Sequence, residues 1–304
     1  MMFIRLSTYA MGCDFEVYAF GEEGLSLRVA AEAAVAEVER VEQLLSHYLP
    51  DSEVSYLNAH AAREAVRVHP EVFDLLERAL HLSKETRGAF DVTVMPLLRC
   101  WGFFTGIGQV PDAQTIAEAL QRVGASQIRL DPQQLTVSFL QDGVGIHLGA
   151  IGKGYGVDRA IEVLKEAGVP AAMVHGGHSS VRAYGAPADA GGWQINLPHP
   201  LYPERSQAHL LLRNRAISTS SATEQYFERG GRRYGHILDP RTGLPVENDL
   251  LCVSVLADEA TVTDALSTAF FVLGENGIRE YISAHPGVQA VILRQGAQQP
   301  EWVG

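Results

Sequence analysis

Apolar residues recur with two different periods along the chain, which predicts a mixture of helices and strands. A period near 3.6 residues predicts amphipathic helices over 26–45, 70–86, 111–123 and 157–167. Alternating or short continuous apolar runs predict strands at 15–20, 128–130, 135–140, 173–185, 191–197, 209–212 and 251–257. The polar, proline-containing stretch 198–207 is predicted to be a loop. Because no regular βαβ series is present, the pattern indicates an α+β fold and not a doubly wound sheet.

Composition narrows the class of protein. At 304 residues the chain is long enough for one large domain or two closely packed lobes, and 46% hydrophobic with 20% charged residues is ordinary for a globular protein. The net charge of −12 argues against nucleic-acid binding. Three widely spaced cysteines, Cys13, Cys100 and Cys252, predict neither a disulfide framework nor a zinc site. No signal-peptide pattern and no apolar run of about 18 residues is present, so we expect a cytoplasmic protein without a transmembrane segment, although a chain trimmed of its leader would look the same.

The segment from His236 to Pro245, HILDPRTGLP, predicts a rigid turn that carries a titratable side chain. Pro240 restricts its own φ and disfavours the helical region for Asp239, while Gly243 can adopt a positive φ. A turn of this kind holds nearby side chains at defined angles, as catalysis requires. The alternative is a well-made β-turn with a histidine that merely faces solvent.

The stretch 257–274 predicts a buried helix that carries Asp264 and Thr268 on one side. A carboxylate and a hydroxyl are hard oxygen ligands, which suit Mg²⁺ or Ca²⁺ better than zinc. The alternative is structural: Asp264 favoured by the helix dipole, and Thr268 bonded back to a main-chain carbonyl.

A glycine-rich segment, from His147 to Asp158, precedes the predicted helix 157–167. Free N–H groups at such a helix start attract phosphate, and Lys153 adds a positive charge beside them. The spacing fits neither a Walker A loop nor a dinucleotide fingerprint. Close packing alone is an equally ordinary reason for these glycines.

Seven segments together resemble the FAD:protein FMN transferases, the ApbE-like flavin transferases, and they occur in that family's order from Met11 to about Gly274. The segments, with the family patterns that they resemble, are MGC at 11–13 (MGT), SHYLPDSE at 46–53 with Asn58 (SxYxPxSE…N), GAFDVTVMPL at 88–97 with WGF at 101–103 (GAFDPTVGPL…WGF), HLGAIGKGYGVD at 147–158 (DLGGIAKGYAVD), HGGH at 175–178 (NGGD), HILDPRTGLP at 236–245 (HIIDPxTGxP) and TDALSTA at 263–269 (ADALATA). The resemblance implies an ApbE-like α+β fold: one domain over 1–304, built of two closely packed lobes with the active cleft between them.

The resemblance also implies an activity. Members of this family use a divalent metal, usually Mg²⁺, to cleave the pyrophosphate of FAD, and they transfer FMN to a Thr or Ser hydroxyl of a target flavoprotein, releasing AMP. It assigns His236 as the general base and Lys153 to the nucleotide. The metal ligands are Ala150, through its carbonyl, with Asp264 and Thr268, and Ser267 adds a contact. The positions that contact FAD in relatives are Met11, Tyr48, Ala89, Phe90, Asp91 and Leu238.

Three departures from the family pattern leave alternatives open. His147 and His178 stand where the family usually has Asp, and the segment 219–226 replaces its usual Ser-Gly-Asp-Tyr run. His147 can still donate a hydrogen bond to a phosphate or a ring nitrogen of FAD. One alternative function is an Mg²⁺-dependent FAD pyrophosphatase that gives FMN and AMP, and another is a flavin-binding protein without turnover. Whether the chain forms a homodimer is left open by the sequence.

Overall fold

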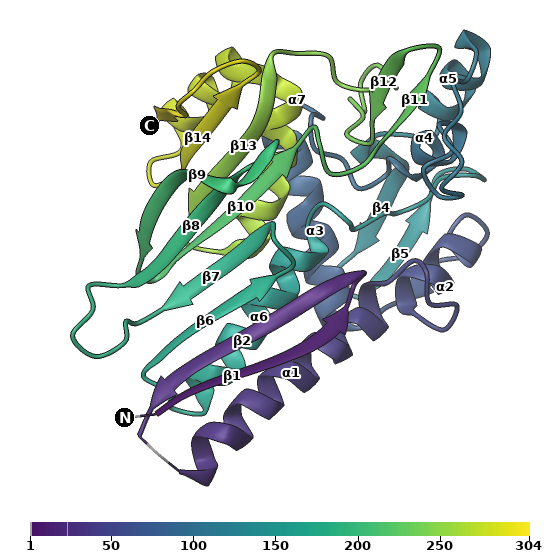
Figure 1. Ribbon diagram of the computed structural model, residues 1–304. Coiled ribbons are helices and arrows are strands. Elements are labelled where there is room, and N and C mark those ends of the chain that lie inside the picture. The colour runs from purple at the N-terminus through teal and green to yellow at the C-terminus, as the bar shows by residue number, and fades with distance from the viewer. Residues whose placement is uncertain (1, 23) are drawn as a thin grey trace.

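A single eight-stranded sheet forms the framework of the computed structural model, which describes residues 2–22 and 24–304 (Figure 1). Every neighbouring pair in this sheet is antiparallel. The strands, in order across the sheet, are β1 (Met2–Ala10), β2 (Cys13–Gly21), β6 (Ala171–Gly176), β7 (Ser180–Tyr184), β10 (Arg215–Ser221), β13 (Leu250–Ala257), β14 (Gln289–Arg294) and β15 (Glu301–Val303). An antiparallel sheet combined with helices confirms the predicted α+β class.

Three long helices pack against the sheet: α1 (Leu25–Leu45), α6 (Gly152–Glu166) and α7 (Ala260–Ala284) (Figure 1). Helix α6 is the central one and contacts both α1 and α7 as well as β6 and β7. Its start was predicted wrongly at residue 157, because the glycines that precede this point are helical too. The predicted end of the last helix at Gly274 marks a break, at φ 67° and ψ 179°, after which helical residues continue to Ala284. None of the helices within 2–22 and 24–304 is both long and apolar enough to cross a membrane.

Asp158 on α6 fixes the beginning of α7. Its carboxylate accepts hydrogen bonds from the backbone N–H groups of Ala260, at 2.9 Å, and Thr261, at 2.8 Å, and it forms an ion pair with Arg182. These N–H groups belong to the first turn of α7 and have no partner within the helix. The bonds therefore lock α7 against α6, which sets the position of Asp264 one turn further along.

A hairpin of β8 (Trp193–His199) and β9 (Tyr202–Leu212) packs on the sheet through Trp193, Ile195 and Leu197. The predicted loop at 198–207 is therefore wrong, since the strands are joined by a short turn. The side chains in the first half of β9 are exposed on both faces, so this segment lacks the alternation of apolar and polar residues that predicts a strand. Pro198 of β8 lies at a register shift, where a proline is tolerated.

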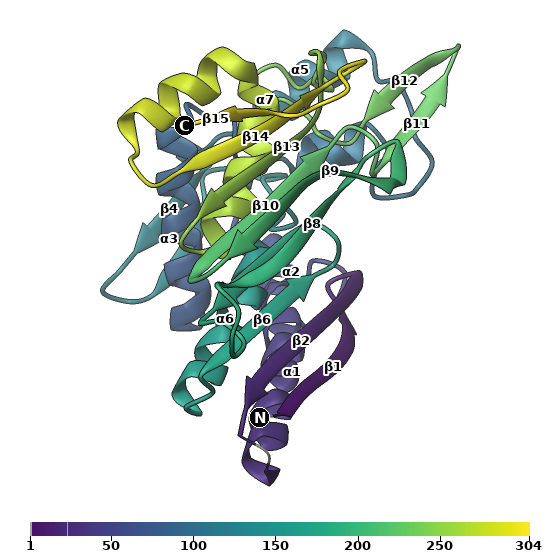
Figure 2. The same ribbon diagram turned by 60° about the vertical axis from the view of Figure 1, so that its left-hand side comes forward.

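The remaining elements form a smaller region beside the sheet (Figure 1). They are the helices α2 (Glu53–His60), α3 (Pro70–Glu85), α4 (Met95–Cys100) and α5 (Ala113–Leu120), the 3-10 turn Ala125–Gln127, the sheet of β3 (Val66–Arg67), β5 (Thr136–Phe139) and β4 (Ile128–Asp131), and the hairpin of β11 (Tyr226–Arg229) and β12 (Arg232–Gly235). The predicted hairpin at 128–140 is confirmed, and the helix predicted over 111–123 is shorter. Figure 2 shows β11 and β12 projecting from the rest of the chain.

One hydrophobic cluster joins this smaller region to the sheet and α7. It contains Leu76 and Phe90 from the smaller region together with Val253 of β13 and Phe270 of α7. Because the two regions share a core, we propose that the chain forms a single domain of two lobes.

Candidate active site

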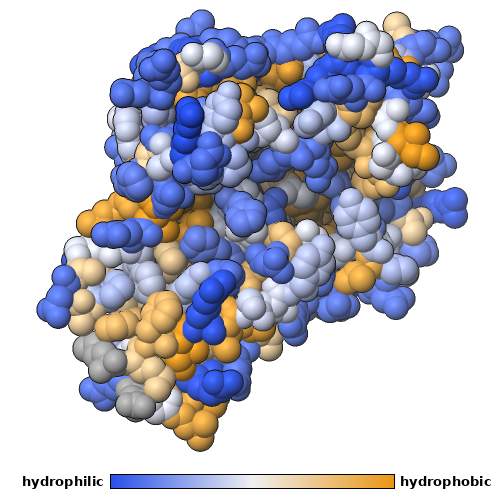
Figure 3. All heavy atoms as spheres, in the orientation of Figure 1, coloured by the Kyte–Doolittle hydropathy of each residue, from blue (hydrophilic) through white to orange (hydrophobic). Residues whose placement is uncertain are grey.

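A pocket of about 530 Å³ lies where both lobes contribute residues. It is lined by twelve of the thirteen site residues predicted from the sequence: Met11, Tyr48, Ala89, Phe90, Asp91, His147, Ala150, Lys153, His236, Leu238, Asp264 and Thr268. Figure 3 shows the surface hollowed near its centre, with hydrophilic and hydrophobic residues around the hollow. The structure therefore brings together residues that are far apart in sequence. Ser267 is the one predicted residue that does not line this pocket.

Asp264 is almost fully buried, and both of its carboxylate oxygens have a partner. The N–H of Gly154 donates to Oδ2 at 2.9 Å, and the hydroxyl of Ser180 donates to Oδ1 at 3.0 Å. A Cβ atom at Gly154 would lie 2.1 Å from the carbonyl oxygen of Ala260, so only glycine lets α6 approach α7 this closely. This glycine is needed for packing, and its N–H is not free for a phosphate.

Hydroxyl groups connect the next turn of α7 to β10. Ser267 donates a hydrogen bond to the carbonyl oxygen of Asp264 at 2.9 Å, and its oxygen lies 2.9 Å from that of Ser220. The oxygen of Ser220 lies 3.2 Å from that of Thr268. Ser267 therefore uses its hydroxyl inside the protein, while Thr268 and Ser220 reach the pocket.

The turn before α6 carries His147 and Ala150, and Lys153 lies in the first turn of α6 itself. Asn58 holds its start, because the amide of Asn58 both donates to and accepts from the backbone of Ile146, at 2.9 and 2.7 Å. The ammonium of Lys153 donates to the carbonyl oxygen of Gly149 at 3.1 Å. The carboxylate of Asp264 raises the pKa of Lys153 against the opposing effect of burial, so the ammonium stays charged in the pocket.

His236 follows β12 and is held by the carbonyl oxygen of Gln225. Its backbone N–H and its ring Nδ1 lie 3.0 and 2.9 Å from that oxygen. A carbonyl oxygen can only accept, so Nδ1 carries the proton and Nε2 of the neutral ring is free to take one. Burial lowers the pKa of His236, which keeps the ring neutral. The ring therefore has the protonation state of a general base.

The turn after His236 is as rigid as predicted. Arg241 donates to the carboxylate of Asp239 through its backbone N–H and its guanidinium, at 2.8–2.9 Å. Gly243 has a φ of 73°, and its carbonyl oxygen accepts a hydrogen bond from the indole of Trp101 at 2.8 Å. Leu238 and Pro245 form a β-bridge that closes the turn.

The aromatic residues at the pocket differ in exposure. Tyr48 is 72% exposed, whereas Phe90 is 2% exposed and belongs to the hydrophobic core. Asp91 braces its loop, since its carboxylate accepts hydrogen bonds from the backbone and hydroxyl of Thr93. Met11 lies in the two-residue turn between β1 and β2, with a φ of 52°, and its N–H donates to Glu42.

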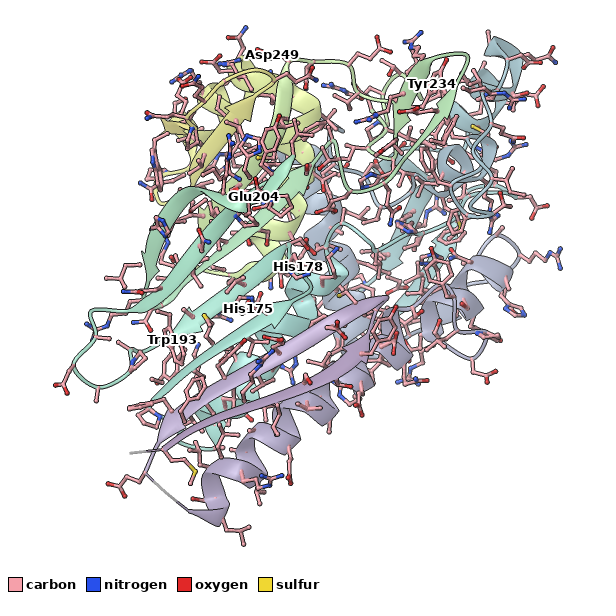
Figure 4. The ribbon with its side chains drawn as sticks, viewed as in Figure 1. His175, His178, Trp193, Glu204, Tyr234 and Asp249 are labelled. Atoms are coloured by element: carbon pink, nitrogen blue, oxygen red, sulfur yellow. The ribbon has the colours of Figure 1, made fainter. Side chains whose placement is uncertain are left out.

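Two histidines stand side by side at the pocket. The ring centres of His47 and His147 are 4.4 Å apart, and His47 also lies 3.8 Å from the ring of Tyr48. Burial lowers the pKa of His147 to about 3 and that of His47 to about 4, so both rings are neutral at pH 7. His178, by contrast, does not line the pocket and lies in the turn between β6 and β7, near His175 (Figure 4).

Several pocket residues were missed by the sequence analysis: Glu42, His47, Ser179, Thr219, Ser220, Glu224 and Gln225. The only signal for Ser220 was the run of hydroxyl residues at 218–221, in which every second side chain faces the same side if the run is a strand. Glu42 lies on α1 and Thr219 on β10, and the remaining four come from loops whose course is set by tertiary packing. Within the described part of the chain, no three His, Cys, Asp or Glu side chains are grouped to hold a metal, so a cation here would depend on Asp264, hydroxyls and carbonyls.

Comparison with known proteins agrees with this arrangement. A sequence model described as the ApbE family matches residues 11–292, which span the hairpin tip at Met11, the pocket and α7. The chain belongs to the ApbE family. Relatives in this family include the FAD:protein FMN transferase of Haemophilus influenzae, 34% identical over 96% of this chain and 86% of the relative. That of Treponema pallidum is 34% identical over 92% of this chain and 81% of the relative.

Solved structures of ApbE proteins share the fold. The ApbE protein of Thermotoga maritima superposes with a TM-score of 0.90 at 31% identity, covering 99% of this chain and 97% of that one. The apo form of the flavinyl transferase ApbE of Pseudomonas stutzeri gives a TM-score of 0.86 at 29% identity, covering 99% and 94%. The predicted ApbE-like fold is therefore confirmed.

Proposed function

We propose that this protein is an FAD:protein FMN transferase that moves FMN from FAD to a Thr or Ser hydroxyl of a target flavoprotein. The acceptor oxygen forms a bond to the phosphorus of the FMN moiety, the bond from that phosphorus to the AMP oxygen breaks, and AMP leaves. The acceptor's proton passes to Nε2 of His236. The observation that carries the proposal is that His236, neutral with its free Nε2, shares one pocket with Asp264, Thr268 and Lys153. The names of the relatives support the same reaction.

The oxygen atoms that α7 and the turn before α6 present to the pocket fit Mg²⁺. Asp264 supplies a carboxylate, Thr268 a hydroxyl and Ala150 a main-chain carbonyl, and all three residues line the pocket. Hard oxygens of this kind are the ligands that Mg²⁺ prefers. When bound, Mg²⁺ neutralises negative charge on the phosphate oxygens. Ser267 contributes indirectly, since its hydroxyl is bonded to the Asp264 carbonyl.

FAD would occupy the remainder of the pocket. Lys153 supplies the positive charge for the pyrophosphate, as its ammonium is kept protonated beside Asp264. Tyr48 presents an exposed ring, and neutral His147 accepts a long hydrogen bond from the N–H of Gly149 at Nδ1, which leaves its Nε2–H as a donor. The other proposed FAD contacts are Met11, Ala89, Phe90, Asp91 and Leu238. The acceptor flavoprotein is the proposed protein partner, and the cytoplasm is the proposed location.

The test is to identify the products made from FAD and MgCl₂, with and without a candidate acceptor flavoprotein. Mass spectrometry should show the acceptor heavier by one FMN unit, with AMP released in equal amount. A variant acceptor with Val in place of the acceptor Thr should stay unmodified. Free FMN and AMP with an unmodified acceptor would instead indicate a pyrophosphatase, and bound but intact FAD would indicate a flavin-binding protein without turnover.

A further inference from the structure

Strand β10 and helix α7 meet through a short ladder of buried hydroxyl groups. Ser218 and Ser220 both face α7, two residues apart on the strand. The oxygen of Ser218 lies 2.8 Å from that of Thr263, and the oxygen of Ser220 lies 2.9 Å from that of Ser267 and 3.2 Å from that of Thr268. The ladder therefore has two steps of similar chemistry.

Only one step of the ladder reaches the pocket. Ser220 and Thr268 line it, whereas Ser218 and Thr263 do not and are completely buried. The two steps thus share a strand, a helix and a type of contact, but differ in whether they touch the candidate metal site. This difference separates a structural role from a role in binding.

The protons of the Ser220 step can be assigned by counting donors. Each hydroxyl has one proton to donate. Ser267 donates its proton to the carbonyl oxygen of Asp264, so the contact between Ser267 and Ser220 requires the proton of Ser220. The contact between Ser220 and Thr268 then requires the proton of Thr268. Thr268 Oγ1 is left with its lone pairs free and its proton directed at β10.

We propose that Ser220 is a positioning residue for the cation: by accepting the proton of Thr268, it turns the lone pairs of Thr268 Oγ1 toward the pocket. A divalent cation needs such lone pairs and is repelled by a hydroxyl proton that points at it. Groups that orient metal ligands in this way contribute to affinity without touching the metal. The inference rests on the proposed function, in which Asp264 and Thr268 hold Mg²⁺.

The experiment compares Ser220→Ala with Ser218→Ala. Each variant removes one hydroxyl from the same buried interface, so both should lower the melting temperature of the full chain. Only Ser220→Ala should weaken Mg²⁺ binding, by roughly tenfold, when MgCl₂ is titrated into the protein by calorimetry with and without FAD. Ser220→Thr, which keeps a hydroxyl, should bind Mg²⁺ more tightly than Ser220→Ala.

Equal weakening of Mg²⁺ binding by the two alanine variants, or no weakening by Ser220→Ala, would overturn the inference and leave the proposed function standing. A wild-type chain that binds no Mg²⁺ under either condition would remove the proposed metal site itself, and this inference with it. If Ser220→Ala does not fold, Ser220→Cys gives the same measurement, because a thiol is close in size but a weak hydrogen-bond partner.

Discussion

Asp264 combines a buried carboxylate with two hydrogen-bond donors from other elements, Gly154 and Ser180. These donors hold the carboxylate in one orientation but compensate only part of the charge that burial isolates from water. A cation in the pocket would compensate the remaining negative charge of Asp264. Substitution of Asp264 by Asn or by Ala can therefore separate the effect of its charge from the effect of its hydrogen bonds.

Asp264→Asn should abolish Mg²⁺-dependent turnover, because it keeps the shape of the side chain and removes the anionic ligand. Asp264→Ala should do the same and also lower stability by about 1–3 kcal/mol, since it leaves the Gly154 N–H and the Ser180 hydroxyl without their acceptor. FMN transfer and thermal unfolding, measured on both variants, check this. Full activity of either variant at ordinary Mg²⁺ concentrations would exclude the metal role.

His236→Ala should lower FMN transfer by roughly 10²–10⁴-fold, the usual contribution of a general base. FAD binding should change little, because Lys153 and the metal ligands are untouched. If His236 instead only braces this region through its hydrogen bond to Gln225, FMN transfer should be normal and the melting temperature lower. Measurement of transfer, FAD affinity and melting temperature on this one variant separates the two.

The pH dependence of transfer should also report on His236. A protonated ring cannot accept the acceptor's proton, so the rate should fall on the acid side. Because burial lowers the pKa of His236 below the usual value near 6.5, the acid limb of the rate profile should be centred below pH 6.5. A rate profile at saturating FAD and Mg²⁺ checks this, and an acid limb centred above pH 6.5 would contradict it.

At the scale of elements, the contact between α6 and α7 determines the geometry of the site. Gly154→Ala should destabilise the fold markedly, by more than 1 kcal/mol, because its Cβ would lie 2.1 Å from the Ala260 carbonyl oxygen. Gly152→Ala is the matched control: it lies on the same helix, and its nearest neighbour to a new Cβ is 3.8 Å away. Chemical denaturation should show a lower free energy of unfolding for Gly154→Ala and an unchanged one for Gly152→Ala. Equal stability of the two variants would refute the packing argument.

The boundaries of the elements show what periodicity can detect. Helix α3 and strand β13 were predicted within a residue or two, since each carries a clear apolar pattern. Strand β1 was missed although it pairs with β2 along its whole length, because at this sheet edge most of its residues are exposed or only partly buried. Strands β14 and β15 were missed as well. Local sequence does not say which partner a short segment will pair with.

For the whole molecule, partly buried neutral histidines should make stability fall in acid. Burial lowers the pKa of His47, His147, His175 and His236. In the unfolded chain these rings take up protons near pH 6.5, while in the folded protein they do so only at lower pH, about 4 for His47 and 3 for His147. The stability is therefore fully present above pH 6.5 and is lost as pH falls toward the folded values.

Removing one such histidine should make the free energy of unfolding depend less steeply on pH, by up to about 1.4 kcal/mol per pH unit between pH 6.5 and 5. His147→Asn is suitable, because the Asn oxygen can accept the hydrogen bond from Gly149 that Nδ1 accepts. Urea denaturation at several pH values measures the slope, with the exposed His81→Asn as control. An unchanged slope for His147→Asn would contradict the assignment of a neutral His147 ring in the folded protein.

The α+β class, the rigid turn after His236 and the spacing of Asp264 and Thr268 on one helix face could all be predicted from the sequence, because these features depend on neighbours within a few residues. Resemblance to a family then selected the residues that meet in the pocket. Three contacts could be found only in the folded structure: Gly154 donates to Asp264, Gln225 bonds Nδ1 of His236 and leaves Nε2 free, and Ser220 lies within hydrogen-bond distance of Thr268. Each of these contacts joins elements separated along the chain, so its partner follows from packing and not from local pattern.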